Sequence, residues 1–292
     1  GKLVAFNPTA GPGVTNPNKK LLIMDFAAAT RTFSNVRTVV DNTALGAGQR
    51  PGWPAFLPDG ESLVFHQQSK AGGDGNNAGA LYTRRGAKAQ IHWTNTKDAT
   101  KVTPLNALNG LDAKGVSYLP KLSAPVALAC TGDGQSVGGI DADHADDANL
   151  NYEPTVNPVA SGGYAWVVVT SRRMYGNVAT IPPFCSDPRG VNLFTTITTK
   201  KLWVAAIDLG AKPGEDASHP AFYLPSQELM AGNARGFWVL DPCRGDGQSC
   251  DSGDQCCNGY CTANAASGSL ECGNMPPDAQ CSAEGDKCLQ DG

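Results

Sequence analysis

Cysteine is the residue type whose spacing carries the most chemistry in this sequence. Eight of the ten cysteines lie in residues 243–292, at positions 243, 250, 256, 257, 261, 272, 281 and 288. Thiols at this density either pair as disulfides or bind a metal as thiolates. Zinc sites favour two short C-x2–4-C pairs and often histidine, but this segment has no histidine and no second, separate pair beside Cys257 to Cys261. We therefore expect disulfides, with metal ligation as the alternative, and an oxidising compartment: secreted, periplasmic or cell surface.

Residues 243–292 are poor in large apolar side chains, so cross-links must hold this segment in shape. The spacing C-x6-C-x5-C-C-x3-C-x10-C, with Cys256 adjacent to Cys257, resembles the inhibitor cystine knot, or knottin. Six cysteines alone allow fifteen pairings. The resemblance implies the pairs Cys243–Cys257, Cys250–Cys261 and Cys256–Cys272.

Four cysteines remain outside that pattern. Cys281 and Cys288 repeat the opening spacing of the knot, so we expect a second, truncated knot to begin at residue 281. Whether these two pair with each other stays open. By parity we expect Cys130 to bond to Cys185, which in the loop-entropy picture stabilises by about 3–5 kcal/mol.

Carboxylates gather at Asp141, Asp143, Asp146 and Asp147. Calcium takes six to eight oxygen ligands from irregular loops of this kind. The spacing departs from the EF-hand loop, and a solvated acidic loop is the alternative. Calcium is the one cofactor that the sequence suggests.

Two adjacent arginines, Arg172 and Arg173, follow the apolar run 164–171, with Tyr175 close behind. Paired guanidinium groups can clamp a carboxylate or phosphate, so these three residues are candidates to face a ligand. The alternative is an arginine pair that is simply exposed at a strand end.

The tripeptide Arg244-Gly245-Asp246 matches the adhesion motif of disintegrin-like proteins. A tripeptide of common residues arises easily by composition, and we interpret it as coincidence.

No catalytic constellation is visible. The four histidines, at 66, 92, 144 and 219, are scattered, and no G-x-S-x-G, H-E-x-x-H or glycine-rich phosphate loop occurs. We expect His66 and His92 to be packed and satisfied within strands, and we expect no enzymatic activity from the residues present.

The elements that must position these residues are strands. Short β-branched or aromatic runs separated by Gly and Pro predict an all-β fold without a capped amphipathic helix. The expected strands are 2–6, 21–26, 62–66, 80–83, 90–94, 164–171, 202–207 and 236–240.

Several of these strands follow a repeated approach sequence. Pro54-Ala-Phe-Leu-Pro-Asp-Gly60 precedes strand 62–66, Pro220-Ala-Phe-Tyr-Leu-Pro225 precedes 236–240, and the weaker Pro154-Thr-Val156 precedes 164–171. Residues 1–6 match the second half of the unit. A proline-led strand, a tight Asp-Gly turn and a core strand form a unit that must stack on neighbours.

This unit resembles the TolB-type (WD40-like) β-propeller repeat. The resemblance implies propeller blades over residues 1–242, with insertions near 70–80 and 105–152, and the disulfide-rich tail over 243–292. A β-sandwich is the alternative. Only about four strand-pair starts are visible, whereas propellers have about four to eight blades, so we expect an incomplete propeller with blades upstream of Gly1.

The formal net charge of −4 and the lack of a long basic run argue against nucleic acid. No apolar run approaches the roughly 18–20 residues of a membrane span. The lack of an Asn-x-Ser/Thr sequon (x not Pro) indicates a bacterial source.

We therefore expect a secreted or cell-surface, non-catalytic binding or assembly protein. Its expected partner is a protein or polysaccharide at the cell surface, or another chain that completes the propeller. One alternative is an extracellular enzyme, polysaccharide-active or redox, whose active site lies in sequence upstream. A second is a structural subunit of an extracellular filament.

Overall fold

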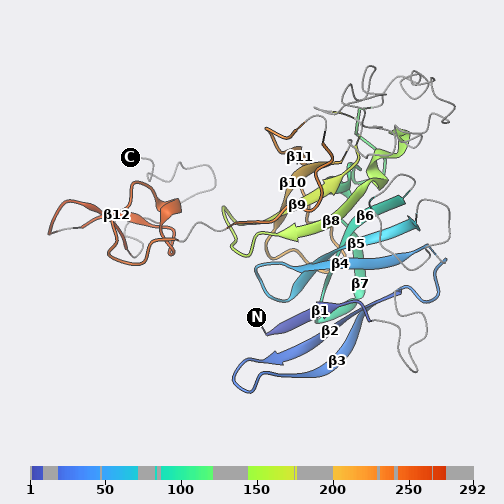
Figure 1. Ribbon diagram of the computed structural model, residues 1–292, viewed down its shortest axis with the longest axis horizontal. Coiled ribbons are helices and arrows are strands. Elements are labelled where there is room, and N and C mark those ends of the chain that lie inside the picture. The colour runs from blue at the N-terminus through green and yellow to red at the C-terminus, as the bar shows by residue number, and fades with distance from the viewer. Residues whose placement is uncertain are drawn as a thin grey trace. The chain divides into compact units, whose positions relative to one another are not determined.

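The computed structural model in Figure 1 describes residues 2–8, 19–46, 48–71, 83, 87–120, 144–173, 175, 200–228, 231–239, 243–264 and 266–273. Strands dominate these residues, and the helical segments are short, so the predicted all-β class is confirmed. The helical segments are α1 (Asn106–Asn109), η3 (His144–Asn149) and η4 (Gly253–Gln255). The chain forms two compact units, Gly1–Trp238 and Val239–Gly292.

The first unit contains three antiparallel sheets, each built from strands in chain order and none closed on itself. The first sheet comprises β1 (Leu3–Phe6), β2 (Lys20–Ala27) and β3 (Thr32–Asp41). The second comprises β4 (Arg50–Phe56), β5 (Ser62–Ala71), β6 (Ala87–Asn95) and β7 (Asp98–Pro104). The third comprises β8 (Asn151–Val156), β9 (Tyr164–Ser171), β10 (Lys201–Asp208) and β11 (Phe222–Tyr223).

The predicted Asp-Gly turn joins β4 to β5. Asp59 Oδ1 accepts hydrogen bonds from the backbone N–H groups of Glu61 and Ser62, at 2.9 and 2.8 Å. Gly60 has φ of 69°, a left-handed conformation that costs glycine little. The turn sequence thus closes the hairpin that the repeat predicts.

The middle sheet packs against both of its neighbours (Figure 1). On β5, Leu63 and Phe65 share a core with the first sheet, while Val64 between them faces a core shared with the third. Alternate residues of a strand point to opposite faces, so an unbroken apolar run suits a strand that is buried on both sides. The first core also contains Leu21, Ile23, Val39 and Val40, and the second contains Ile91, Trp93, Val167, Val169 and Trp203.

Two sequence predictions about the Pro220 repeat are wrong. Residues 236–239 form no strand, and Phe222–Tyr223 is not an approach strand but β11, which pairs with β10 through Trp203 opposite Tyr223. A proline–aromatic run suits an edge strand as well as an approach strand, which explains the error. Of the predicted strand 80–83, only Thr83 lies within the described residues.

The second unit is held together by sulfur. β12 (Cys261–Ala263) and β13 (Leu270–Cys272) form its hairpin. Its disulfides join Cys243–Cys257, Cys250–Cys261 and Cys256–Cys272, the pairs that the knottin resemblance implies, with Cα–Cα distances of 4.8, 5.9 and 5.3 Å. Cys130, Cys185, Cys281 and Cys288 lie outside the described residues.

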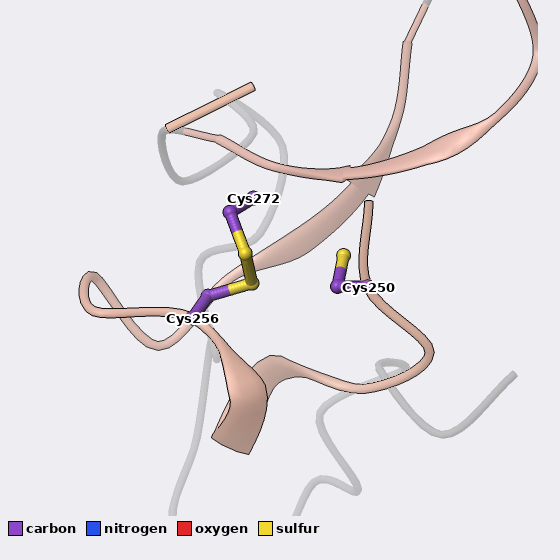
Figure 2. A group of neighbouring side chains, drawn as sticks. All are labelled: Cys250, Cys256 and Cys272. Carbon is purple, nitrogen blue, oxygen red and sulfur yellow. A yellow bond between two sulfur atoms is a disulfide. The ribbon is translucent and has the colours of Figure 1, made fainter. Parts of the chain in front are cut away.

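The core of this unit is the cluster of Cys250, Cys256 and Cys272 (Figure 2). Their sulfur atoms lie within 4.8 Å of one another and all three residues are buried. Because each sulfur is bonded in a disulfide, none is a thiolate ligand. The alternative of metal ligation is therefore wrong for these cysteines.

Candidate functional site

The first strands of the second and third sheets share one irregularity. Pairing of β4 with β5 runs from Gly52 opposite His66 to Ala55 opposite Val64, so that Trp53 and Pro54 bulge out of register. Pairing of β8 with β9 shows the same shift around Glu153 and Pro154. Trp53 and Glu153, the residues before each proline, have φ of 53° and 49°. Left-handed backbone is uncommon at such residues and clusters at functional sites.

A third residue, Arg235, has the same conformation, with φ of 50°. Its N–H donates to Thr170 Oγ1 at 2.9 Å, and Thr155 Oγ1 donates to the carbonyl of Gly236 at 2.6 Å. A Cβ on Gly236 would lie 3.1 Å from both methyl groups of Val168, so the backbone approaches the third sheet closely. Residues 233–238 therefore lie on the third sheet as β8 lies on the second.

The side chains of these three residues interact. The guanidinium carbon of Arg235 lies 4.5 Å from the centroid of the Trp53 ring and 5.2 Å from that of Phe237, both within cation–π range. The charge of Arg235 also acts on the Glu153 carboxyl group. We name Trp53, Glu153 and Arg235 the inner-edge cluster. Trp53 and Glu153 lie on β4 and β8, the first strands of the second and third sheets, and Arg235 lies on the segment that packs on the third sheet.

Glu153 is the titrating member of the inner-edge cluster. Burial raises its pKa, because desolvation disfavours the carboxylate. Lys200, a hydrogen bond from Thr170 at 3.4 Å and Arg235 act in the opposite direction. Glu153 as a residue is 9% exposed.

Arg235 is the cation of the cluster. None of the ion pairs formed among the described residues includes it. Its Nε and the Nε1 of Trp53 are buried without a hydrogen-bond partner in the described part of the chain. A guanidinium group that lies over an indole ring, and that pairs with no carboxylate among the residues described, can receive an anion through two parallel hydrogen bonds.

The predicted arginine pair lies elsewhere and is not exposed. Arg172 and Arg173 are 1% and 0% exposed at the end of β9, so the alternative of a solvated pair is wrong. Arg172 Nη2 donates to the carbonyl of Ala87 and to the Tyr152 hydroxyl, each at 2.7 Å. The bond to Ala87 connects the third sheet to the second.

Arg173 and Tyr175 do come together. Arg173 lies over the Trp203 ring at 5.2 Å, donates to the carbonyl of Leu108, and lies 3.5 Å from the Tyr175 hydroxyl. The Tyr175 ring packs edge-on against Trp203. The ligand-facing role of these residues stays a prediction.

The predicted calcium ligands are divided. Asp141 and Asp143 lie outside the described residues. Asp146 accepts a hydrogen bond from Lys88 Nζ at 2.8 Å, and the charge of the buried Asp147 raises the pKa of Arg173 against the effect of burial. Both described carboxylates therefore face cations of the protein, and a calcium site here stays a prediction.

Histidines 66 and 92 lie in β5 and β6, as expected, but their hydrogen bonding differs from the prediction. Both ring nitrogens of His66, and Nδ1 of His92, have no hydrogen-bond partner within the described chain. Burial lowers the pKa of His66 to about 3 and that of His92 to about 4. The expectation that His66 is satisfied is therefore wrong, since it is a neutral ring packed edge-on to Tyr152.

The Arg244-Gly245-Asp246 tripeptide is tied into its own unit. Arg244 Nη1 donates to the carbonyl of Ser249, and Asp246 Oδ1 accepts from Asn258 Nδ2 at 2.7 Å. Both charged side chains thus form hydrogen bonds within the second unit, and the interpretation of this motif as coincidence stays a prediction.

Sequence reasoning missed the inner-edge cluster. Trp53-Pro54 and Glu153-Pro154 both lie in the repeat, and the residue before each proline was the available signal. Arg235 precedes glycine instead, so no proline marks it.

Comparison with known proteins gives no relative for this chain: no protein-family model matches it, and no curated protein does. In the described part of the chain, no helix has the length and apolarity that crossing a membrane requires.

Proposed function

We propose that this protein is a secreted or cell-surface, non-catalytic binding protein. Its stacked sheets would form part of a β-propeller that presents the inner-edge cluster to a protein or polysaccharide partner. The observation that carries the proposal is the meeting of Trp53, Glu153 and Arg235 from three segments of the first unit that lie far apart in the sequence. Disulfides in the second unit agree with an oxidising compartment.

A repeated contact between sheets supports the propeller. Asn7, just after β1, donates to the carbonyl of Pro51 at 2.9 Å, and Thr170 on β9 accepts from Arg235 N–H. His66 on β5 makes the corresponding contact between the second and third sheets, since its ring centroid lies 5.5 Å from that of Tyr152 on β8. In each case one sheet contacts the segment that follows it in the stack, as radial repetition requires.

Binding fits the chemistry of the cluster better than catalysis does. Burial raises the pKa of Glu153, and among the described residues Lys200, Thr170 and Arg235 lower it. No second carboxylate or histidine in this part of the chain shifts that pKa. Catalysis by a carboxyl group is commonly supported by a second titrating group or a nucleophile within reach of the substrate. The Glu153 carboxyl group beside the Arg235 guanidinium group suits recognition of a ligand instead.

The experiment compares the full chain with its Arg235→Gln variant. Both are applied to a panel of immobilised cell-surface polysaccharides and extracellular proteins, and retention and released products are measured. The matched control is Arg37→Gln, which removes a charge from β3, where Arg37 pairs with Asp25 at 2.9 Å.

We expect retention by the wild type and by Arg37→Gln, and a loss of about tenfold or more for Arg235→Gln. Equal retention of Arg235→Gln and the wild type would contradict the proposed site. Release of cleaved products would favour the enzymatic alternative.

A second candidate, assembly with another chain, is favoured by the first sheet. Leu21 and Ile23 of β2 face the first core, whereas Leu22, Met24 and Phe26 lie on the opposite face and are half-buried. A strand that is apolar on both faces suits a sheet covered on both sides. Light scattering tests this: Met24→Lys should reduce the mass of any oligomer to that of one chain, and a wild-type monomer would contradict it.

A further inference from the structure

The guanidinium group of Arg235, which forms no ion pair with another described residue, determines the first property of a ligand for the inner-edge cluster. Two other described arginines are engaged: Arg37 with Asp25, and Arg172 with carbonyl and hydroxyl oxygens. The guanidinium carbon of Arg235 instead lies 4.5 Å from the centroid of the Trp53 ring. A planar donor pair matches the two oxygens of a carboxylate.

The local charge also favours an anion of modest charge. Arg235 and Lys200 both act on Glu153, so two cations surround one carboxyl group. A carboxylate would balance this excess, whereas a phosphate or sulfate would place more negative charge or charged oxygens beside Glu153.

The remaining groups indicate the rest of the ligand. Phe237 is 72% exposed, and its ring centroid lies 5.2 Å from the guanidinium carbon of Arg235. An exposed ring gains by covering its apolar face, for example with the C–H face of a pyranose. Glu153 can accept a hydrogen bond from a hydroxyl group. A carboxylate, a C–H face and hydroxyl groups occur together in a hexuronate.

We propose that the inner-edge cluster binds a hexuronate unit of an acidic cell-surface polysaccharide. Arg235 holds the carboxylate, Phe237 covers the sugar ring, and Glu153 accepts from a hydroxyl group. This inference rests on the proposed binding function and names its ligand class.

Calorimetry on the full chain tests the ligand class with a tetramer of glucuronate and with the methyl ester of the same tetramer. The ester keeps every ring and removes the charges, so it is a control that needs no variant. We expect the acid form to bind and the ester to bind about tenfold more weakly or not at all. Equal binding of the two, or no binding of the acid form, overturns the proposal.

Variants locate the site. Arg235→Gln should weaken binding of the glucuronate tetramer about tenfold or more, and Arg235→Lys should fall between it and the wild type. Phe237→Ser should weaken binding as well, while Arg37→Gln should bind like the wild type. Because Arg235→Lys keeps the charge, its affinity stays informative if Arg235→Gln fails to fold.

An acidic peptide serves as the competing ligand class. If acetylated tetraglutamate binds as tightly as the glucuronate tetramer, recognition is of a bare carboxylate and the hexuronate proposal is wrong. If the glucuronate tetramer fails while retention on the panel still depends on Arg235, the ligand class is wrong and the proposed binding function stands.

Discussion

The buried histidine of β5 makes stability depend on pH in a direction that the structure fixes. His66 is 0% exposed, both of its ring nitrogens lack a partner among the described residues, and burial lowers its pKa from 6.5 to about 3. The folded pKa lies below the unfolded one, so as pH falls the unfolded state takes up the proton first. The contribution is therefore complete above pH 6.5 and is lost as pH falls toward 3.

The expected loss follows from linkage. Each pH unit within that window costs about 1.4 kcal/mol per imidazole, so lowering the pH from 6.5 to 4.5 costs about 2–3 kcal/mol through His66. His92, with a pKa of about 4, costs about as much over the same interval. In His66→Leu the loss that His66 causes disappears. The substitution also removes from this position a buried polar ring that has no hydrogen bonds.

Urea unfolding at pH 7.5 and 4.5, followed by tryptophan fluorescence, measures this effect. All five tryptophans lie in residues 1–238, so the signal reports on the first unit. His66→Leu should lose about 2–3 kcal/mol less than the wild type between the two pH values. The control is His219→Gln, since His219 is exposed and 2.9 Å from Asp208. Equal pH dependence in His66→Leu and the wild type would refute the reasoning.

Further predictions concern backbone fit, cross-links and turns. Gly236→Ala should destabilise the first unit by about 1–3 kcal/mol, because its Cβ would press on Val168. Gly46→Ala should change stability little in the same urea titration, because its Cβ would meet only the Gln49 side chain, at 4.0 Å. Replacing Cys256 and Cys272 together with serine opens a loop of sequence separation 16 and should cost about 3 kcal/mol, seen as faster proteolysis of residues 243–273; unchanged proteolysis would contradict a sulfur core. Asp59→Ala should cost about 1 kcal/mol through the two lost turn hydrogen bonds, and Asp59→Asn less; equal losses would assign the effect to charge.

Much of the fold could be predicted because strands and turns leave local signals. Runs such as that of β9 are β-branched and aromatic, and Asp59-Gly60 specifies its turn. β3 and β7 were missed because one is largely exposed and both carry polar residues, so propensity alone does not mark them. Residues 236–239 have strand propensity but no paired strand, and a strand forms only with a partner.

The candidate site could not be predicted for a different reason. Trp53, Glu153 and Arg235 come together through the stacking of units far apart in the sequence, and their residue types share nothing. The burial of Arg173 was equally hidden, because its acceptor is the carbonyl of Leu108, which no local pattern connects to it. Charged residues are rarely buried, so exposure was the natural expectation.

The two-sided burial of β5 has a consequence for how the first unit comes apart. Leu63 and Phe65 belong to one core and Val64 to the other, so neither core can open while β5 stays in place beside its other neighbour. Amide hydrogens of β5 should therefore exchange only through the global transition, while β3 exchanges through local fraying. The three sheets then unfold as one cooperative unit, and local opening is confined to outer strands such as β3.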